Sequence, residues 1–313
     1  MKNKPLFFVK KPGVYSSFQD LGRWGYQQYG VVVSGAMDSY ALQVGNLLVG
    51  NERNEAGIEV TLKGPELEIQ STFQIAITGA DLSPTLNGEP APMWKSFEVA
   101  KGDVLSFGAP KKGIRAYITV AGGFDVPITM GSKSTYEKAG IGKALKKEDR
   151  IEGFETTGKA GIGLVSSEIP DYKKEVEIHV VLGPHQDYFT DEAIHTFFTS
   201  VHTVSAQSDR MGYRLDSPKI EHKSNADIYS DAIPLGGIQI PASGQPIILM
   251  ADRQTTGGYT RIGTVISSDI SKLAQLPPGG KIRFKEATVE EAKASVLEIE
   301  QELSQIAVRA GVY

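Results

Sequence analysis

The 313-residue sequence contains no cysteine, which excludes disulfides, thiolate catalysis and cysteine-ligated zinc. Its 33 Lys and Arg against 37 Asp and Glu give a net charge of −4, so nucleic-acid binding has no electrostatic support. No apolar stretch approaches the ~20 residues that a membrane span needs. The apolar run at residues 6–9 is too short for a signal peptide. We therefore expect a cytoplasmic protein that binds neither nucleic acid nor membrane.

Standard motifs for catalysis are also missing. The histidines (179, 185, 195, 202 and 222) fall at none of the usual metal-ligand spacings, so no metal site is predicted. The segment 140–145 lacks the third glycine of a dinucleotide fingerprint and the Ser or Thr of a phosphate-binding loop. No Gly-x-Ser-x-Gly elbow exists, and nothing selects a nucleophile.

Short alternating strands dominate what is present, among 34 glycines and 16 prolines. This pattern predicts a mainly β protein with a few helices, and it contains no βαβ periodicity that would favour a doubly wound sheet. A glycine turn followed by an alternating strand occurs at 101–107 and again at 279–284. We interpret the repetition as two related β-barrel units, residues 1–170 and 171–313.

Helices are predicted where capping residues precede apolar periodicity. Asp38 is expected to cap a helix over 39–49, and Thr190 one over 191–198. The segment 30–33, rich in β-branched residues, is predicted to be a strand.

A capping box, Thr288 with Glu291, predicts a C-terminal helix from Val289 to about Val308. Its apolar stripe (289, 292, 296, 299, 303 and 306) could lie on the protein's own barrel or receive a partner helix. Packing on its own barrel is the commoner outcome and the one we favour.

The most unusual loop is 251–261, which separates two apolar strands, 246–250 and 262–266. It contains two arginines, hydroxyls and a Gly257–Gly258 pair, which could adopt positive φ and let a ligand approach the backbone. Hydroxyls and N–H groups beside arginine can hold a carboxylate or a phosphate. A solvated hairpin tip is the alternative.

Two further loops also combine arginine, a carboxylate and glycine: 19–25 with its continuation at 34–38, and 208–214. For Asp209–Arg210 and Asp252–Arg253, the alternative is that the aspartate simply caps a turn while the arginine pairs locally. His185 is a further candidate because it follows Gly183-Pro184 at a strand exit. The candidate substrate- or anion-binding residues are Arg210, Arg253, Gln254, Thr255, Thr256, Gly257, Gly258, Tyr259, His185 and Asp209.

Four motifs in these loops carry a family resemblance: residues 18–25 (FQDLGRWG), 34–38 (SGAMD), 208–215 (SDRMGYRL) and 251–259 (ADRQTTGGY). They resemble the allophanate hydrolase subunit 2, or biotin-dependent carboxyltransferase-like, family over nearly the whole chain. The resemblance implies tandem cyclophilin-like β-barrels plus the C-terminal helix.

For stand-alone members, the resemblance implies one component of a heteromeric, ATP-dependent 5-oxoprolinase that opens 5-oxoproline to L-glutamate. The implied partners are the other two 5-oxoprolinase components, a KipI-like protein (the B component) and the A component, with ATP bound as its magnesium complex. Arg253 or Arg210 would then hold the substrate carboxylate.

Two alternatives stay open. One is a carboxyltransferase of the urea carboxylase type, which would need a biotinylated partner because this chain carries no covalently bound biotin. The other is a binding protein that antagonises a KipI-type histidine-kinase inhibitor.

Overall fold

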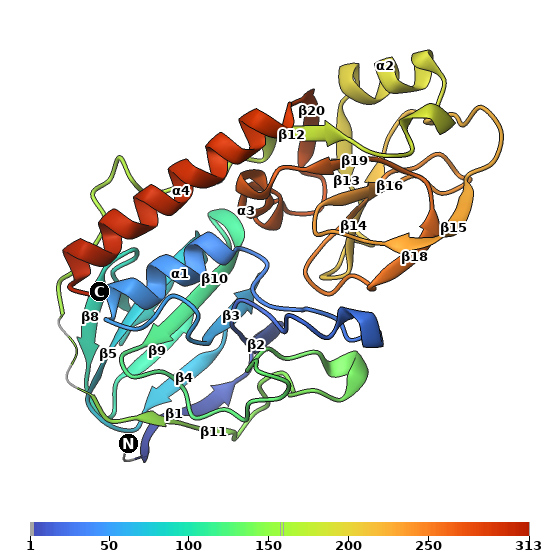
Figure 1. Cartoon of the computed structure of the whole chain (residues 1–313). Coiled ribbons are helices and arrows are strands. Elements are labelled where there is room, and N and C mark those ends of the chain that lie inside the picture. The colour runs from blue at the N-terminus through green and yellow to red at the C-terminus, as the bar shows by residue number, and fades with distance from the viewer. Residues whose placement is uncertain (1–2, 157, 159, 313) are drawn as a thin grey trace. The chain divides into compact units, whose positions relative to one another are not determined.

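The computed structural model describes residues 3–156, 158 and 160–312, and it is mainly β with four α-helices in that part of the chain (Figure 1). The chain divides into two compact units. The first comprises Met1–Arg23, Ser34–Tyr172 and Gln301–Tyr313, and the second comprises Trp24–Val33 and Lys173–Glu300. The predicted fold class, mainly β with a few helices, is confirmed. Each unit is assembled from separate segments of the chain, so a single boundary at 170/171 does not describe the division.

Within the described residues, the first unit contains eleven strands in two sheets. One sheet has the order β11-β1-β4-β9-β6-β7 and the other β2-β3-β10-β5-β8. The strands are β1 (Asn3–Lys11), β2 (Tyr15–Gln19), β3 (Gly57–Thr61), β4 (Glu66–Ile69), β5 (Phe73–Asp81), β6 (Pro84–Leu86), β7 (Glu89–Pro90), β8 (Ser96–Val99), β9 (Val104–Phe107), β10 (Lys112–Val120) and β11 (Arg150–Phe154). Alternate residues of both sheets enclose one apolar core that includes Phe7, Ile77 and Ile118.

Helix α1 (Ser39–Leu48) packs on β5 and β10. Asp38 caps it as predicted, since its Oδ1 accepts a hydrogen bond from the N–H of Ala41 at 3.0 Å. Below the helix start, the hydroxyl of Tyr117 donates to the buried carboxylate of Glu59 at 2.7 Å. Burial, with nearby carboxylates, raises the pKa of Tyr117 well above its ordinary value, so the phenol stays protonated.

The second unit contains a closed seven-stranded barrel in the order β12-β19-β16-β17-β14-β13-β20. The parallel pairing of β20 with β12 closes it. Its strands are β12 (Glu175–Leu182), β13 (His202–Val204), β14 (Gly212–Asp216), β16 (Gly237–Gln239), β17 (Ile247–Leu249), β19 (Arg261–Val265) and β20 (Lys281–Glu286). Helix α2 (Asp191–Thr199), capped by Thr190 as predicted, packs against β20, and the short α3 (Ile270–Ala274) lies against β12.

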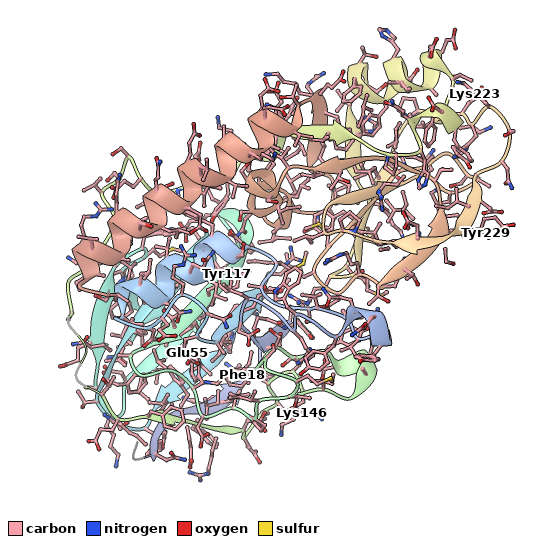
Figure 2. The ribbon with its side chains drawn as sticks, viewed as in Figure 1. Phe18, Glu55, Tyr117, Lys146, Lys223 and Tyr229 are labelled. Atoms are coloured by element: carbon pink, nitrogen blue, oxygen red, sulfur yellow. The ribbon has the colours of Figure 1, made fainter. Side chains whose placement is uncertain are left out.

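A separate two-stranded ribbon extends from this barrel. It pairs β15 (Asp227–Ala232) with β18 (Thr256–Tyr259) in antiparallel register. Nearly every residue of β15 is exposed, and Tyr229, labelled in Figure 2, is 99% exposed. Part of the loop 251–261 is therefore a strand of this ribbon.

Two local predictions were wrong. Residues 30–33 form no strand, because the left-handed Gly30 (φ 77°) ends a 3₁₀ turn at Gln27–Tyr29, and Val32 and Val33 bury their side chains without pairing in a sheet. Residues 15–19, for which no strand was predicted, form β2 and pair with β3. Both errors come from tertiary pairing that local propensity does not determine.

Helix α4 runs from Val289 to Ala310. The predicted capping box is present, because the hydroxyl of Thr288 accepts from the N–H of Glu291 and the Glu291 carboxylate accepts from the N–H of Thr288. Its residues up to Glu300 belong to the second unit and the rest to the first. No helix in the described ranges is both long enough and apolar enough to cross a membrane.

Candidate functional site

A cavity of about 330 Å³ lies in the second unit, beside the base of the ribbon. The β17–β18 connection forms one wall, the segment after β15 forms another, and the loop 24–33 forms a third. The lining residues are Trp24, Gln27, Val33, Ala232, Ile233, Pro234, Arg253, Gln254 and Thr255. Three of the ten predicted site residues, Arg253, Gln254 and Thr255, are therefore brought together here.

Arg253 supplies the only charged side chain among the residues that line this cavity. It is 7% exposed, and its Nε donates to the carbonyl of Ile233 at 3.1 Å while Nη1 donates to that of Met250 at 3.4 Å. Burial lowers its pKa to about 10, so the guanidinium remains charged at neutral pH. No carboxylate within the described residues forms an ion pair with it. A buried cation held by two neutral carbonyls favours an anionic ligand.

Arg210, the other predicted carboxylate-binding residue, has a protein partner. Its Nε and Nη2 donate to the two carboxylate oxygens of Asp252 at 2.9 and 3.0 Å. Asp209 accepts from the backbone N–H groups of Met211 and Gly212, which fixes the turn before β14. The turn-capping alternative thus describes Asp209, whereas Arg210 pairs with a carboxylate 42 residues away instead of locally. Arg253 differs from both.

Gly257 and Gly258 do not adopt the left-handed conformation that their sequence allows, because both lie in β18. A Cβ on Gly257 would lie 2.6 Å from Cδ1 of Ile233 and 2.7 Å from Nε2 of Gln239. On Gly258 the nearest atom would be the carbonyl oxygen of Ile228 at 3.4 Å. The close packing of Ile233 and Gln239 against residue 257 thus favours a glycine at this position. Neither Gly257 nor Gly258 lines the cavity.

The remaining candidates lie on the ribbon or at its base, outside the cavity lining. Thr256 and Tyr259 are exposed at the two ends of β18. The half-buried ring of His185 packs edge-to-face on Tyr188 and accepts a hydrogen bond at Nδ1 from the N–H of Arg261 at 3.2 Å. Burial, reinforced by the charge of Arg261, lowers the pKa of His185.

The first Arg/Asp/Gly loop has a structural role in the first unit. Arg23 is completely buried and donates to the carbonyls of Thr129 and Ser134. Asp20 accepts from the hydroxyls of Ser132 and Ser134. These contacts anchor the chain just before it enters the second unit at Trp24.

Trp24 and Gln27 are site residues that sequence reasoning did not name. Trp24 lies inside the motif 18–25, and it is 59% exposed although it lines the cavity. An aromatic residue close to two glycines was the available signal. In the described part of the chain, no group of three or more His, Asp or Glu side chains could hold a metal ion.

The fold and the cavity define a two-unit β protein with a buried cationic site suited to an anionic group. The chain belongs to the carboxyltransferase domain family, subdomains A and B, whose family model matches residues 29–286. It is similar to the C component of the 5-oxoprolinase of Escherichia coli, with 36% identity over 96% of this chain and 97% of that protein. The component of the same name in Haemophilus influenzae is 35% identical over 88% of this chain and 90% of its own length.

Among solved structures, the urea amidolyase of K. lactis is similar, with a TM-score of 0.89 and 30% identity. That similarity covers 98% of this chain but only 20% of the larger protein. The same fold therefore occurs both as a separate protein and as one part of a longer enzyme.

Proposed function

We propose that this chain is one component of a heteromeric, ATP-dependent 5-oxoprolinase, and that Arg253 holds the carboxylate of 5-oxoproline. Arg253 carries the proposal, because its buried, charged guanidinium lines a small cavity beside the polar side chains of Gln254 and Thr255. The similarity to the C components of two 5-oxoprolinases, along almost their full lengths, supports the choice of substrate. These names also support partner proteins, which we take to be the A and B components.

The chemistry needs activation because a lactam amide resists water. The lactam oxygen accepts the γ-phosphoryl group of ATP, brought as its magnesium complex, and ADP leaves. One water adds to the activated carbon, the ring C–N bond breaks and an acyl phosphate remains. A second water releases phosphate and gives glutamate.

In this scheme the chain's own residues bind and orient the substrate. Arg253 fixes the carboxylate at one end of 5-oxoproline, which positions the lactam for reaction. The hydroxyl of Thr255 and the amide of Gln254 lie beside it and can donate hydrogen bonds to the oxygen on which charge develops. We assign no nucleophile or base to this chain.

The test is 5-oxoproline-dependent ATP hydrolysis by the wild-type chain reconstituted with both partner proteins. We expect Arg253→Gln to raise the KM for 5-oxoproline roughly 10- to 100-fold, since hydrogen bonds to a charged group contribute about 1.5–3 kcal/mol. Thr255→Val should mainly lower kcat. Arg283→Gln is the matched control, because this exposed arginine of the same unit pairs with Glu175 on the barrel surface.

The possible failures are distinguishable. Full activity in both the Arg253 and the Thr255 variants would overturn the site while leaving the function in place. No 5-oxoproline-dependent hydrolysis with the wild-type chain would overturn the function itself.

Carboxyl transfer is a second candidate, favoured by the similarity to a urea amidolyase over 98% of this chain. It would use a biotinylated partner as the carboxyl donor, and Arg253 would hold the carboxylate in transit. Adding a carrier protein that already bears N-carboxybiotin, with urea as the carboxyl acceptor, to the same reconstitution separates the two candidates. Carboxylation that depends on the carrier would select this alternative.

A further inference from the structure

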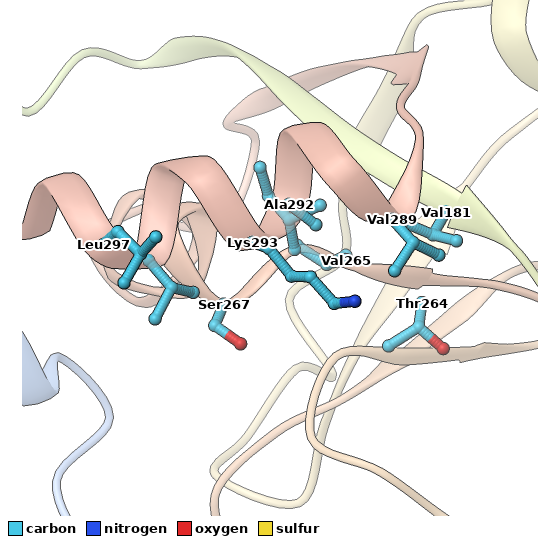
Figure 3. Close-up of a pocket in the computed structure, with 10 residues that line it drawn as sticks. Val181, Thr264, Val265, Ser267, Val289, Ala292, Lys293 and Leu297 are labelled. Carbon is cyan, nitrogen blue, oxygen red and sulfur yellow. The ribbon is translucent and has the colours of Figure 1, made fainter.

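An apolar groove of about 560 Å³ lies in the second unit, between the first half of α4 and strands β12 and β19 (Figure 3). On the helix side, its apolar wall is formed by Val289, Val296 and Leu297, which are 47%, 38% and 62% exposed. We call this surface the α4 groove. It is separate from the Arg253 cavity, since the two share no lining residue.

The two halves of α4 differ in burial. Leu303, Ile306 and Ala310 in its second half are buried, whereas no side chain between Val289 and Glu300 is. The favoured prediction, that the whole apolar stripe packs on the protein's own barrel, is therefore wrong for this half. One side of this half of the helix does approach the rest of the second unit, because the hydroxyl of Ser268 donates a hydrogen bond to that of Ser295. The adjacent face, which carries Val289, Val296 and Leu297, remains open.

That open face carries charges of both signs. Lys293 lines the groove, extends over it in Figure 3 and makes no ion pair within the described residues. Glu300 follows seven residues later, and seven residues advance a helix by almost two full turns. Lys293 and Glu300 therefore lie on the same face, on opposite sides of Val296 and Leu297.

We propose that the α4 groove is a self-association surface, where the open face of α4 pairs antiparallel with the same face of a second copy of this chain. With the two-fold axis between Val296 and Leu297, Lys293 faces Glu300 of the second copy, and Val296 faces Leu297. The two-fold symmetry makes each of these contacts twice.

This complementarity favours a second copy over an unrelated chain. The same short segment supplies the apolar centre, both charges and their spacing. The groove beside the helix gives room for the apolar side chains of the second α4, as in helix-in-groove recognition. The proposal does not depend on the reaction that the protein catalyses.

The experiment is sedimentation velocity of the full-length chain over a wide concentration range. We expect a reversible dimer for the wild type. Lys293→Glu and Glu300→Lys should each weaken dimerisation about tenfold, because each replaces two attractive pairs by two repulsive ones. The double variant K293E/E300K should regain the wild-type dissociation constant, which a contact that does not pair residues 293 and 300 would not predict.

Glu298→Lys is the control, because residue 298 lies about 140° around the helix from Lys293 and should leave the dimer intact. Leu297→Asp should abolish dimerisation, with circular dichroism confirming the fold. A wild-type chain that is monomeric at all concentrations would overturn the proposal and leave the groove to a different protein. A dimer that tolerates both single reversals, or a double variant as weak as either single one, would overturn it equally.

Discussion

Arg210 and Asp252 form a two-point ion pair that ties the turn before β14 to the residue preceding Arg253. Both side chains are nearly buried, with 10% and 12% of their surface exposed. The N–H of Asp252 also donates to the carbonyl of Arg210 at 2.9 Å. The pair thus fixes the backbone from which the Arg253 side chain enters its cavity, which gives Arg210 a positioning role.

We therefore expect Asp252→Ala to lower the free energy of unfolding by about 3 kcal/mol, because it removes the carboxylate that pairs at two points with a nearly buried guanidinium. The double variant R210M/D252L should lose less, since it removes both charges together. Urea denaturation of the two variants and of Arg210→Met measures the coupling. Equal losses for D252A and the double variant would show that the ion pair does not hold the loop.

Alanine substitutions at Gly257 and Gly258 compare a closely packed position of β18 with a neighbouring position that has more space. Gly257→Ala should cost about 1 kcal/mol of stability, because the buried ends of the Ile233 and Gln239 side chains, 2.6 and 2.7 Å from the added Cβ, would have to shift. Gly258→Ala should be nearly neutral, since the nearest atom would be 3.4 Å away. Thermal unfolding of both variants makes the comparison. Similar melting temperatures would mean that the ribbon does not pack on Gln239 as described.

The burial of His202 predicts that the free energy of unfolding depends on pH. Its ring is buried beside Phe197 and Phe284, and its Nε2 lies 2.8 Å from the carbonyl oxygen of Phe197, which we assign as the acceptor of an Nε2–H hydrogen bond. Burial lowers the pKa of His202 below its ordinary value of 6.5. The unfolded chain then binds a proton near pH 6.5, whereas the folded chain binds it only at lower pH.

Stability should therefore be fully present above pH 6.5 and should fall as the pH drops from there through the lowered pKa of the folded state. One proton changes the free energy of unfolding by at most about 1.4 kcal/mol per pH unit. His202→Gln keeps an N–H donor but cannot titrate, so its unfolding free energy should depend less steeply on pH. Identical slopes in urea titrations at several pH values would exclude His202 as the source.

The sequence predicted the starts of helices best, because a helix cap depends only on residues close together in the chain. The caps at Asp38, Thr190 and Thr288 each rest on a side chain that bonds a backbone N–H three residues away. Each signal lies within four consecutive residues. These helices could therefore be placed without knowledge of the rest of the chain.

The ribbon could not be predicted in the same way. β15 is almost entirely exposed, so it has no apolar alternation, and β18 contains two glycines that disfavour strands. The distinction between Arg210 and Arg253 was equally inaccessible, because the carboxylate that pairs with Arg210 is 42 residues away. Sequence motifs identified the loops, but only the fold separates the paired arginine from the one that lines the cavity.

Trp24 offers a direct test of ligand binding without partner proteins. The chain has two tryptophans. Trp24 lines the Arg253 cavity and is 59% exposed, whereas Trp94 is 3% exposed in the first unit. A ligand in the cavity should remove water from the Trp24 indole and shift its emission to the blue, with little effect on Trp94.

We expect saturable emission changes when 5-oxoproline is added to the Trp94→Phe variant, and none in the Trp24→Phe variant. Adding Arg253→Gln to Trp94→Phe should weaken binding by the factor seen in KM, because the same carboxylate contact is lost. The uncharged amide 2-pyrrolidone, which lacks the carboxylate, serves as the control ligand. If it binds as well as 5-oxoproline, Arg253 does not recognise a carboxylate, and the cavity selects the lactam ring instead.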